Sequence, residues 1–255
     1  MKYPPARWAT EAPTIRLCPQ LLHCMKLLAL ETSAEMASVA LRVGDRLLSR
    51  EGGTPGTHAQ FILGWVGELL NEAGLTLGQL DAIAFSAGPG SFTGLRLAVS
   101  VAQGLALGAG LPLVPVPTLD ALALGRGDGL HLCCVDARMS EVYSVACEVR
   151  DGQVEARTDI RVGPPDSLPP PPDGPAHWQG CGSGFGLAPV MQLAWTSQLA
   201  SIDAAATVHA RDIARLGVIR LAAGQSIDAA LAAPLYVRDK VAQTTAERLA
   251  AGGRA

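Results

Sequence analysis

The stretch with the clearest chemical character is a glycine-rich turn, residues 88–94 (GPGSFTG), which lies between two apolar segments. Glycines ahead of a helix can present backbone amides to a phosphate group. This turn fits neither the P-loop pattern nor G-x-G-x-x-G, and Pro89 removes one of the amides. Phosphate binding is therefore the weaker interpretation, and a structural turn is the stronger one.

A second polar group, Asp136, Arg138 and Glu141, could support acid–base catalysis. The same residue types are also typical of a salt-bridged turn, which is the interpretation we favour. None of the five histidines is spaced i, i+3 or i, i+4 from another, so the sequence predicts no helical metal pair. The sequence also contains no G-x-S-x-G elbow. We expect no catalytic residue, no bound metal and no cofactor in this chain.

Two apolar segments position the glycine-rich turn. Residues 81–86 predict a buried strand, and residues 95–108 predict a helix. Ser91 or Thr93 is the expected N-cap, because a side-chain oxygen there can accept from the unpaired amides of the first turn. Glycines near the end of the helix, with Pro112 beyond them, favour a stop there.

The helix over residues 95–108 is apolar on nearly every side, which is typical of a helix that is mostly covered. Two of its rows hold small residues: Ala98, Ala102 and Ala106 in one, and Ser100, Gly104 and Gly108 in the other. Small residues let a second helix approach closely. Arg96 and Gln103 interrupt a segment that is already shorter than the roughly 18 apolar residues of a membrane span. We infer a helix that lies on a sheet and meets other helices, of this chain or of another, with no membrane contact.

Composition sets the broad class of the protein. The 255 residues are 49% hydrophobic and only 4% aromatic, so a sizeable core must be built mainly from aliphatic side chains. A net charge of -3 argues against a free-standing nucleic-acid binder, which usually carries a basic face. The six cysteines form no C-x-x-C pair and are expected to be reduced thiols in a reducing compartment, the cytoplasm.

The pattern predicts two α/β lobes. We expect a disordered extension over residues 1–24, because prolines are scattered through it. A first lobe over 25–125, a second lobe over 126–242 and a frayed tail over 243–255 are expected to follow. Expected strands of the first lobe are 27–31, 37–43, 46–50 and 112–116, and expected helices are 57–73 and 118–124. Expected strands of the second lobe are 130–135, 141–149 and 177–181, with a long helix over 203–223.

Four stretches, in this order, resemble motifs of the TsaB (YeaZ) family: residues 25–33 (MKLLALETS), 86–108 (SAGPGSFTGLRLAVSVAQGLALG), 135–143 (VDARMSEVY) and 234–242 (PLYVRDKVA). The resemblance implies the two-lobed actin-like ATPase superfold, which sugar kinases and Hsp70 share. The turn over residues 31–35 has no glycine, and Glu31 stands where the family commonly has Asp. We therefore expect degenerate nucleotide loops.

The resemblance also implies a role and partners. The family is the dimerisation subunit of the bacterial machinery that makes threonylcarbamoyladenosine next to the tRNA anticodon. We expect a non-catalytic subunit that binds and activates a TsaD-type catalytic paralogue, works with a TsaE-type ATPase subunit and meets tRNA indirectly. A small-molecule kinase of the same superfold and a homodimeric scaffold are the alternatives.

The helices over residues 57–73 and 93–108 are the implied dimerisation face. Our candidate contacts on this face are Phe61, Trp65, Leu95, Val99, Gln103 and Leu107. Arg238 and Lys240 could touch tRNA phosphate or a partner carboxylate, or form surface salt bridges. A self-paired homodimer, formed when the chain is alone, would use the same face.

Overall fold

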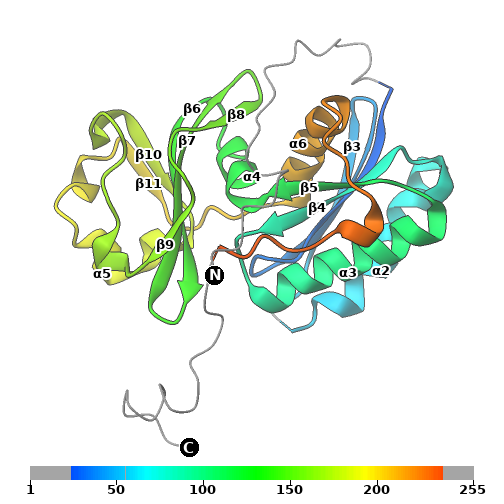
Figure 1. The fold of residues 1–255 in the computed structure, drawn as a ribbon, viewed down its shortest axis with the longest axis horizontal. Helices are drawn as coiled ribbons and strands as arrows, with labels where there is room; N and C mark the ends of the chain where they lie inside the picture. Colours follow the sequence, from blue (N-terminus) through cyan, green and yellow to red (C-terminus); the bar gives the residue numbers. More distant parts are fainter. Residues whose placement is uncertain (1–23, 55, 238–255) are drawn as a thin grey trace, which may run out of the picture.

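A computed structural model describes residues 24–54 and 56–237 of the 255. Two β-sheets lie side by side, each with helices packed against it (Figure 1). The order of the first sheet is β3-β2-β1-β4-β5, and that of the second is β11-β10-β6-β7-β8 with β9 paired to β7. This confirms the expected α/β fold with two lobes. The expected extension, apart from Cys24, and the expected tail lie outside the described residues.

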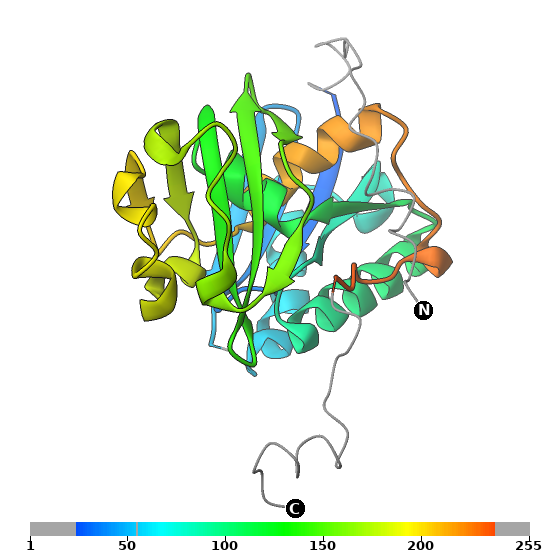
Figure 2. The ribbon, with the colours of Figure 1, turned by 60° about the vertical axis from the view of Figure 1, so that its left-hand side comes forward.

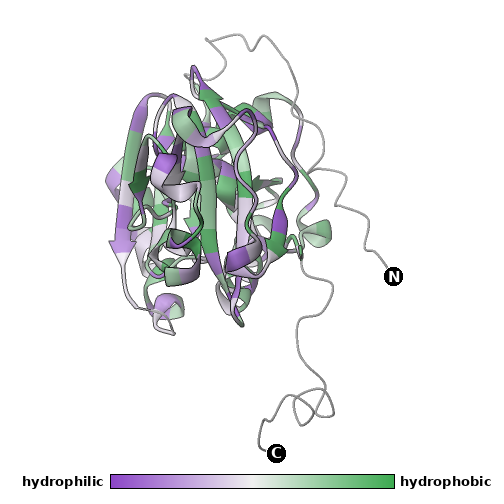
Figure 3. Cartoon of the chain, turned by 90° about the vertical axis from the view of Figure 1, so that its left-hand side faces the viewer, coloured by the Kyte–Doolittle hydropathy of each residue, from purple (hydrophilic) through white to green (hydrophobic). Residues whose placement is uncertain are grey.

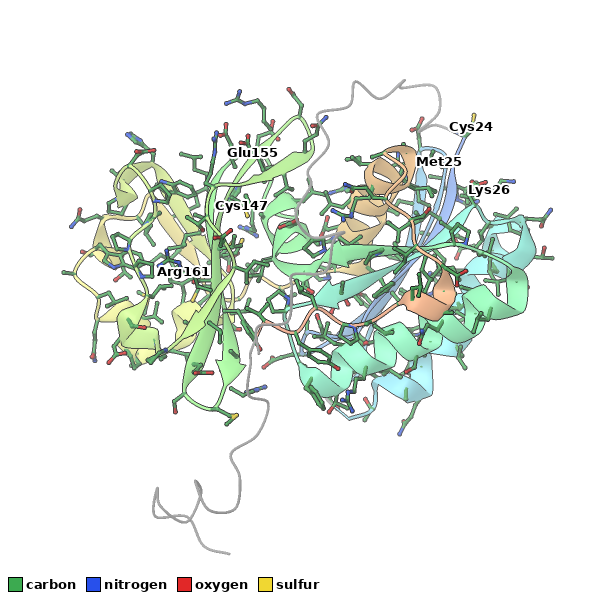
Figure 4. The ribbon with its side chains drawn as sticks, viewed as in Figure 1. Cys24, Met25, Lys26, Cys147, Glu155 and Arg161 are labelled. Atoms are coloured by element: carbon green, nitrogen blue, oxygen red, sulfur yellow. The ribbon has the colours of Figure 1, made fainter. Side chains whose placement is uncertain are left out.

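The first sheet mixes parallel and antiparallel pairing. Its strands are β1 (Lys26–Glu31), β2 (Ala37–Val43), β3 (Arg46–Gly52), β4 (Ala82–Gly88) and β5 (Leu113–Pro117). β1 pairs antiparallel with β2 and parallel with β4. The sequences of β1 and β4 are almost continuously apolar because both faces of the sheet are covered. Cys24, Met25 and Lys26, labelled in Figure 4, mark where the described chain enters β1.

Helices cover the two faces of this first sheet. Alternate side chains of β1 point to opposite faces. Leu28 and Leu30 join one core with α2 (His58–Ala73) and α3 (Phe92–Ala109), while Leu27 joins another core with α6 (Ala210–Ala222). Gly217 of α6 lets that helix lie close to the sheet, because a Cβ there would come within 2.8 Å of the Ala84 Cβ.

The second sheet follows a short connecting helix. Its strands are β6 (Gly129–Arg138), β7 (Glu141–Arg150), β8 (Gln153–Ala156), β9 (Arg161–Gly163), β10 (Trp178–Cys181) and β11 (Ser201–Asp203). The connecting helix, α4 (Thr118–Leu124), packs on β6, β7, β4 and α6, so it links the two lobes. Cys147 on β7 belongs to the core on the α4 side of this sheet (Figure 4).

The far face of the second sheet is covered by short elements. These are α5 (Ala188–Met191) and the 3-10 helices η3 (Pro165–Ser167), η4 (Pro175–His177), η5 (Ser183–Gly186) and η6 (Thr196–Gln198). Trp178 and Phe185 are buried in the core beneath them. In Figure 3, where this lobe faces the viewer, hydrophobic residues run along the strands with hydrophilic residues among them. Two more 3-10 helices, η2 (Leu77–Gln79) and η7 (Ala229–Leu231), belong to the first lobe.

Two sequence predictions about the second half of the chain need correction. The long helix expected over 203–223 begins only at Ala210, because residues 201–203 pair with β10 as strand β11. The region 126–242 is also not one lobe. After β11 the chain crosses back, α6 packs on the first sheet, and η7 packs on α3 (Figures 1 and 2). The backbone bridge between Leu113 and Ile227 closes this return.

Candidate partner-binding face and interlobe cleft

The outward side of α2 carries large apolar residues. Phe61 and Trp65 stack with ring centroids 5.4 Å apart and an interplanar angle of 17°. Phe61 is 39% exposed and Leu63 is 58% exposed, whereas Ile62 and Val66 are buried against the sheet. The helix therefore buries one stripe and leaves a second apolar surface uncovered by the described chain.

α3 is divided in the same way. Its alanine row is buried, with Ala98, Ala102 and Ala106 each 1% exposed or less. The row of small residues with Gly104 and Gly108 faces outward. A Cβ placed on either glycine would meet no atom of the described residues within 4 Å.

Two glycines of α2, Gly64 and Gly67, are equally open: a Cβ there meets no described atom within 4 Å. Packing inside the described chain therefore gives no reason for glycine at these positions, although each costs about 1 kcal/mol relative to alanine in a helix. We define the outward sides of α2 and α3 together as the α2–α3 face. The two helices lie on the same side of the first sheet (Figures 1 and 2).

The structure separates the six candidate contacts into two groups. Phe61 and Leu107, which is 65% exposed, lie on the α2–α3 face, and Trp65 lies beside Phe61 in a half-buried position. Leu95 and Val99 need correction, because they are only 3% and 5% exposed. They share the buried stripe with the alanine row, since residues 95, 98, 99, 102 and 106 follow the helical period.

Gln103 also differs from the expectation. Its side-chain amide donates to the carbonyl oxygens of Ala229 at 2.9 Å and Ala232 at 3.2 Å. These bonds hold the returning segment against α3, so within this structure Gln103 has an internal role. Leu63 is an accessible apolar residue that the sequence analysis missed. Its signal was its place beside Ala59 and Val66 at helical spacing, which widens the apolar arc of the expected helix.

A small aromatic cluster lies at the N-terminal end of α3. The Arg96 guanidinium carbon lies 4.0 Å from the centroid of the Phe92 ring, and the Phe92 and Tyr236 rings are 6.0 Å apart. Arg96 Nε donates to the Tyr236 hydroxyl oxygen at 3.3 Å. Because Arg96 and Tyr236 are far apart in the sequence, no local pattern could have predicted this contact. Arg238 and Lys240, which follow, lie outside the described residues.

The glycine-rich turn packs directly on the turn after β1. Ser91 is the N-cap of α3, and its hydroxyl oxygen accepts from the Gly94 amide at 3.4 Å. Of the two expected N-caps, Ser91 and Thr93, the structure therefore has the first. The Thr32 hydroxyl donates to the Gly94 carbonyl oxygen at 2.6 Å, and the Ser91 amide donates to the Ser33 carbonyl oxygen at 3.1 Å. A Cβ on Gly90 would lie 2.8 Å from the Ser33 Cβ. The glycines thus allow two turns to pack closely. This supports the interpretation of residues 88–94 as a structural turn rather than a phosphate-binding loop.

A cleft of about 1450 Å³ opens between the lobes beside these turns. The residues that line it include Ser33, Gly90, Thr93, Thr118, Asp136 and Ser183. The Arg138 guanidinium forms a salt bridge with the Asp136 carboxylate at 3.1 Å, and the Arg138 backbone amide donates to the same carboxylate at 2.7 Å. The Asp136–Arg138 part of the expected salt-bridged turn is therefore confirmed. Within residues 24–54 and 56–237, no three His, Cys, Asp or Glu side chains are grouped to hold a metal ion.

Two turns stand where the superfold would bind a nucleotide, residues 31–35 in the first lobe and the glycine-rich residues 180–186 in the second. Both use polar groups in hydrogen bonds within the protein. In the second lobe, the Asp136 amide donates to the Ser183 hydroxyl oxygen at 3.1 Å. A Cβ on Gly182 would lie 2.4 Å from the Cys134 carbonyl oxygen, so this turn is pressed against β6. In the first lobe, the Glu31 side chain accepts from Ser33 and Ala34. Neither arrangement resembles an open phosphate cradle.

α3 is long and apolar enough to span a membrane by length and composition alone. A single such helix is weak evidence, since core helices of soluble proteins meet the same criterion. In this structure one side of α3 is packed on the first sheet. Its apolar character is therefore explained by packing together with the α2–α3 face.

Comparison with known proteins gives consistent results. The family model of TsaD, tRNA N6-adenosine threonylcarbamoyltransferase, matches residues 53–246. Proteins named tRNA threonylcarbamoyladenosine biosynthesis protein TsaB are similar: that of Haemophilus influenzae is 44% identical over 124 residues, 47% of this chain and 52% of the relative. That of Escherichia coli is 42% identical over 123 residues, 47% of this chain and 53% of the relative. The chain thus spans about half the length of the curated relatives it matches.

Solved structures extend the similarity over more of the chain. YeaZ from Pseudomonas aeruginosa is 36% identical with a TM-score of 0.75, covering 84% of this chain and 100% of that one. A second structure, described as an uncharacterized protein with similarity to peptidase YEAZ from Pseudomonas aeruginosa, is 37% identical with a TM-score of 0.76 and the same coverage. At these identities the similarity concerns both sequence and fold.

Proposed function

This chain belongs to the TsaB (YeaZ) family, and we propose that it is a non-catalytic subunit needed for threonylcarbamoyl transfer to the tRNA adenosine next to the anticodon. In this proposal it binds and activates a TsaD-type catalytic paralogue. A TsaE-type ATPase subunit completes the assembly, tRNA is met indirectly, and the work takes place in the cytoplasm. The names of the curated relatives, tRNA threonylcarbamoyladenosine biosynthesis proteins, support the pathway.

The observation that carries the proposal is the α2–α3 face. Aromatic side chains are enriched among the residues that dominate binding energy at interfaces, and Phe61 with Trp65 supplies a stacked pair. Open glycines beside them, Gly64 on α2 and Gly104 on α3, would let helices of a second chain approach closely. A surface of this kind is typical of an interface rather than of an isolated monomer.

The absence of open phosphate cradles in the described lobes fits a subunit without its own phosphoryl chemistry. A small-molecule kinase would need a turn that cradles phosphate, and both candidate turns use their groups internally. Titration with ATP and magnesium tests this alternative. Tight binding with turnover by the isolated chain would favour the kinase over the subunit.

The decisive experiment is reconstitution of tRNA modification. The purified TsaD-type and TsaE-type proteins are incubated with unmodified tRNA, threonylcarbamoyl adenylate and ATP, with and without this chain. We expect modified adenosine to form at a useful rate only when the chain is present. Equal rates in its absence would contradict the proposal.

A homodimeric scaffold would use the same α2–α3 face, so self-association alone does not separate the two functions. Size-exclusion chromatography with light scattering, performed on the chain alone and with the TsaD-type paralogue, does so. We expect a heterodimer to replace any homodimer when the paralogue is added. A homodimer that persists in the presence of excess paralogue would favour the scaffold.

A further inference from the structure

Glu31 is a buried acidic residue that lies outside the α2–α3 face. It ends β1 and its side chain is 0% exposed. Its Oε1 atom accepts from three donors: the Ser33 amide, the Ser33 hydroxyl at 2.6 Å and the Ala34 amide at 3.1 Å. One carboxyl oxygen thus accepts from both backbone amides and the hydroxyl of the Ser33–Ala34 pair.

Two successive amides with a neighbouring hydroxyl form the kind of concavity that binds phosphate or another anion in many proteins. Here Ser33 and Ala34 also line the interlobe cleft of about 1450 Å³, so the concavity lies next to a space that a ligand could enter. We propose that the Glu31 carboxyl group fills this concavity from inside the protein, in place of an external anion, and so keeps the turn closed to phosphate.

The energetics of Glu31 agree with such a role. Burial raises the pKa of Glu31, while hydrogen bonds from Ser33, the Ser86 hydroxyl and the Ala34 amide oppose the rise. Burying a carboxyl group is unfavourable unless hydrogen bonds compensate for the lost water. The hydrogen bonds to Oε1 offset this cost, and without that oxygen the amides of Ser33 and Ala34 would lose their acceptor.

Hydrogen bonds to the glycine-rich turn hold the turn after β1 in its conformation. The Ser91 amide donates to the Ser33 carbonyl oxygen at 3.1 Å, and the Thr32 hydroxyl donates to the Gly94 carbonyl oxygen at 2.6 Å. The first bond holds the peptide group that contains the Ala34 amide, and the second holds the residue that precedes Ser33. Removal of the Glu31 side chain should therefore leave the donors in place and unoccupied.

The test compares variants at this position in the full-length chain. Glu31→Ala and Glu31→Ser remove the group that reaches the amides, whereas Glu31→Gln keeps a carbonyl oxygen that can accept from them. Each protein is melted in increasing inorganic phosphate, with sodium chloride at equal ionic strength as the reference. Ligand that binds only the folded state raises the melting temperature.

We expect a saturable, phosphate-specific rise in melting temperature for Glu31→Ala and Glu31→Ser, and none for the wild type or Glu31→Gln. Phosphate should also shift the amide resonances of Ser33 and Ala34 in the two shortened variants alone. Wild-type protein whose Ser33 and Ala34 resonances move with phosphate would overturn the proposal, a measurement that does not depend on any variant folding. Shortened variants that fold but show no phosphate response would overturn it as well.

This inference concerns a different site from the proposed function and has a separate test. Glu31 belongs to the turn after β1, while the α2–α3 face lies on two helices of the same lobe. Failure of the phosphate test would leave the reconstitution experiment unaffected, and failure of reconstitution would leave the phosphate test unaffected.

Discussion

Gly94 lies so close to Thr32 that a Cβ on the glycine would be 1.9 Å from the Thr32 carbonyl oxygen. This contact joins the first turn of α3 to the turn after β1, two segments about sixty residues apart in the sequence. It accounts for glycine at the last position of the glycine-rich turn without any reference to a ligand. The turn is best understood as a packing device.

Replacing Gly94 with alanine should therefore destabilise the chain. Because the atom in the way is a backbone oxygen, neither side can yield cheaply, and we expect a loss of about 3 kcal/mol in the free energy of unfolding. Urea unfolding followed by circular dichroism measures it. Gly78→Ala is the matched control, since a Cβ there meets no described atom within 4 Å. Equal stability of the two variants would contradict the contact.

Replacing Gly104 with tryptophan should abolish pairing with the TsaD-type paralogue. The residue faces outward on α3, so the large side chain is expected to block the close approach of a second helix while the chain itself still folds. Gln192→Trp, at an exposed position in the other lobe, is the control. Co-purification and circular dichroism together measure the outcome, and unchanged pairing of the Gly104 variant would count against the α2–α3 face.

Replacing Gly67 with alanine should stabilise the isolated chain. Alanine is favoured over glycine by up to about 1 kcal/mol within a helix, and no described atom obstructs a Cβ at this position. Thermal unfolding of the chain alone measures the gain. If the glycine serves helix approach, the same variant should bind the paralogue no more tightly, and a destabilised isolated chain would show that the position is packed after all.

Asp120 should make stability depend on pH. Burial raises its pKa from an ordinary 3.8 to about 6, and the Arg220 guanidinium opposes the rise. Between these values the folded state binds the proton more tightly than the unfolded state. The contribution of Asp120 to the free energy of unfolding is therefore fully present below about pH 4 and is lost as the pH rises through 6.

Asp120→Asn tests this dependence, because an amide does not titrate. We expect the variant to lose less stability than the wild type between pH 4 and pH 6, measured by urea unfolding across that range. The pKa values of Glu31 and Asp212 are raised in the same direction, so the slope should be reduced and not abolished. Parallel curves for the two proteins would contradict the assignment.

Local patterns were sufficient to predict most elements of the first lobe. The apolar runs of β1 and β4, the helical period of α2 and the Ser91 cap of α3 all follow from neighbouring residues. The return of α6 to the first sheet could not be predicted in this way. An amphipathic helix shows that one side is covered, but its sequence does not identify the sheet that covers it.

The candidate site shows the same limit. The helical pattern identified α3 as an apolar helix with two rows of small residues, but it could not say which row faced the sheet. Leu95 and Val99 were therefore assigned to the interface although they are buried. Exposed Leu63 was left out, although it stands beside Ala59 and Val66 at helical spacing. The bonds of Gln103 to the returning segment depend on residues more than a hundred positions away.

The return of the chain from β11 to α6 has a consequence for biosynthesis. The side of the first sheet that carries Leu27 and Ala29 is covered mainly by α6, so a nascent chain that has reached only the end of α4 leaves most of that side uncovered. The lobe that is translated first therefore cannot close until α6, which follows the whole second sheet in the sequence, has left the ribosome. Folding of the first lobe is consequently tied to synthesis of the second sheet.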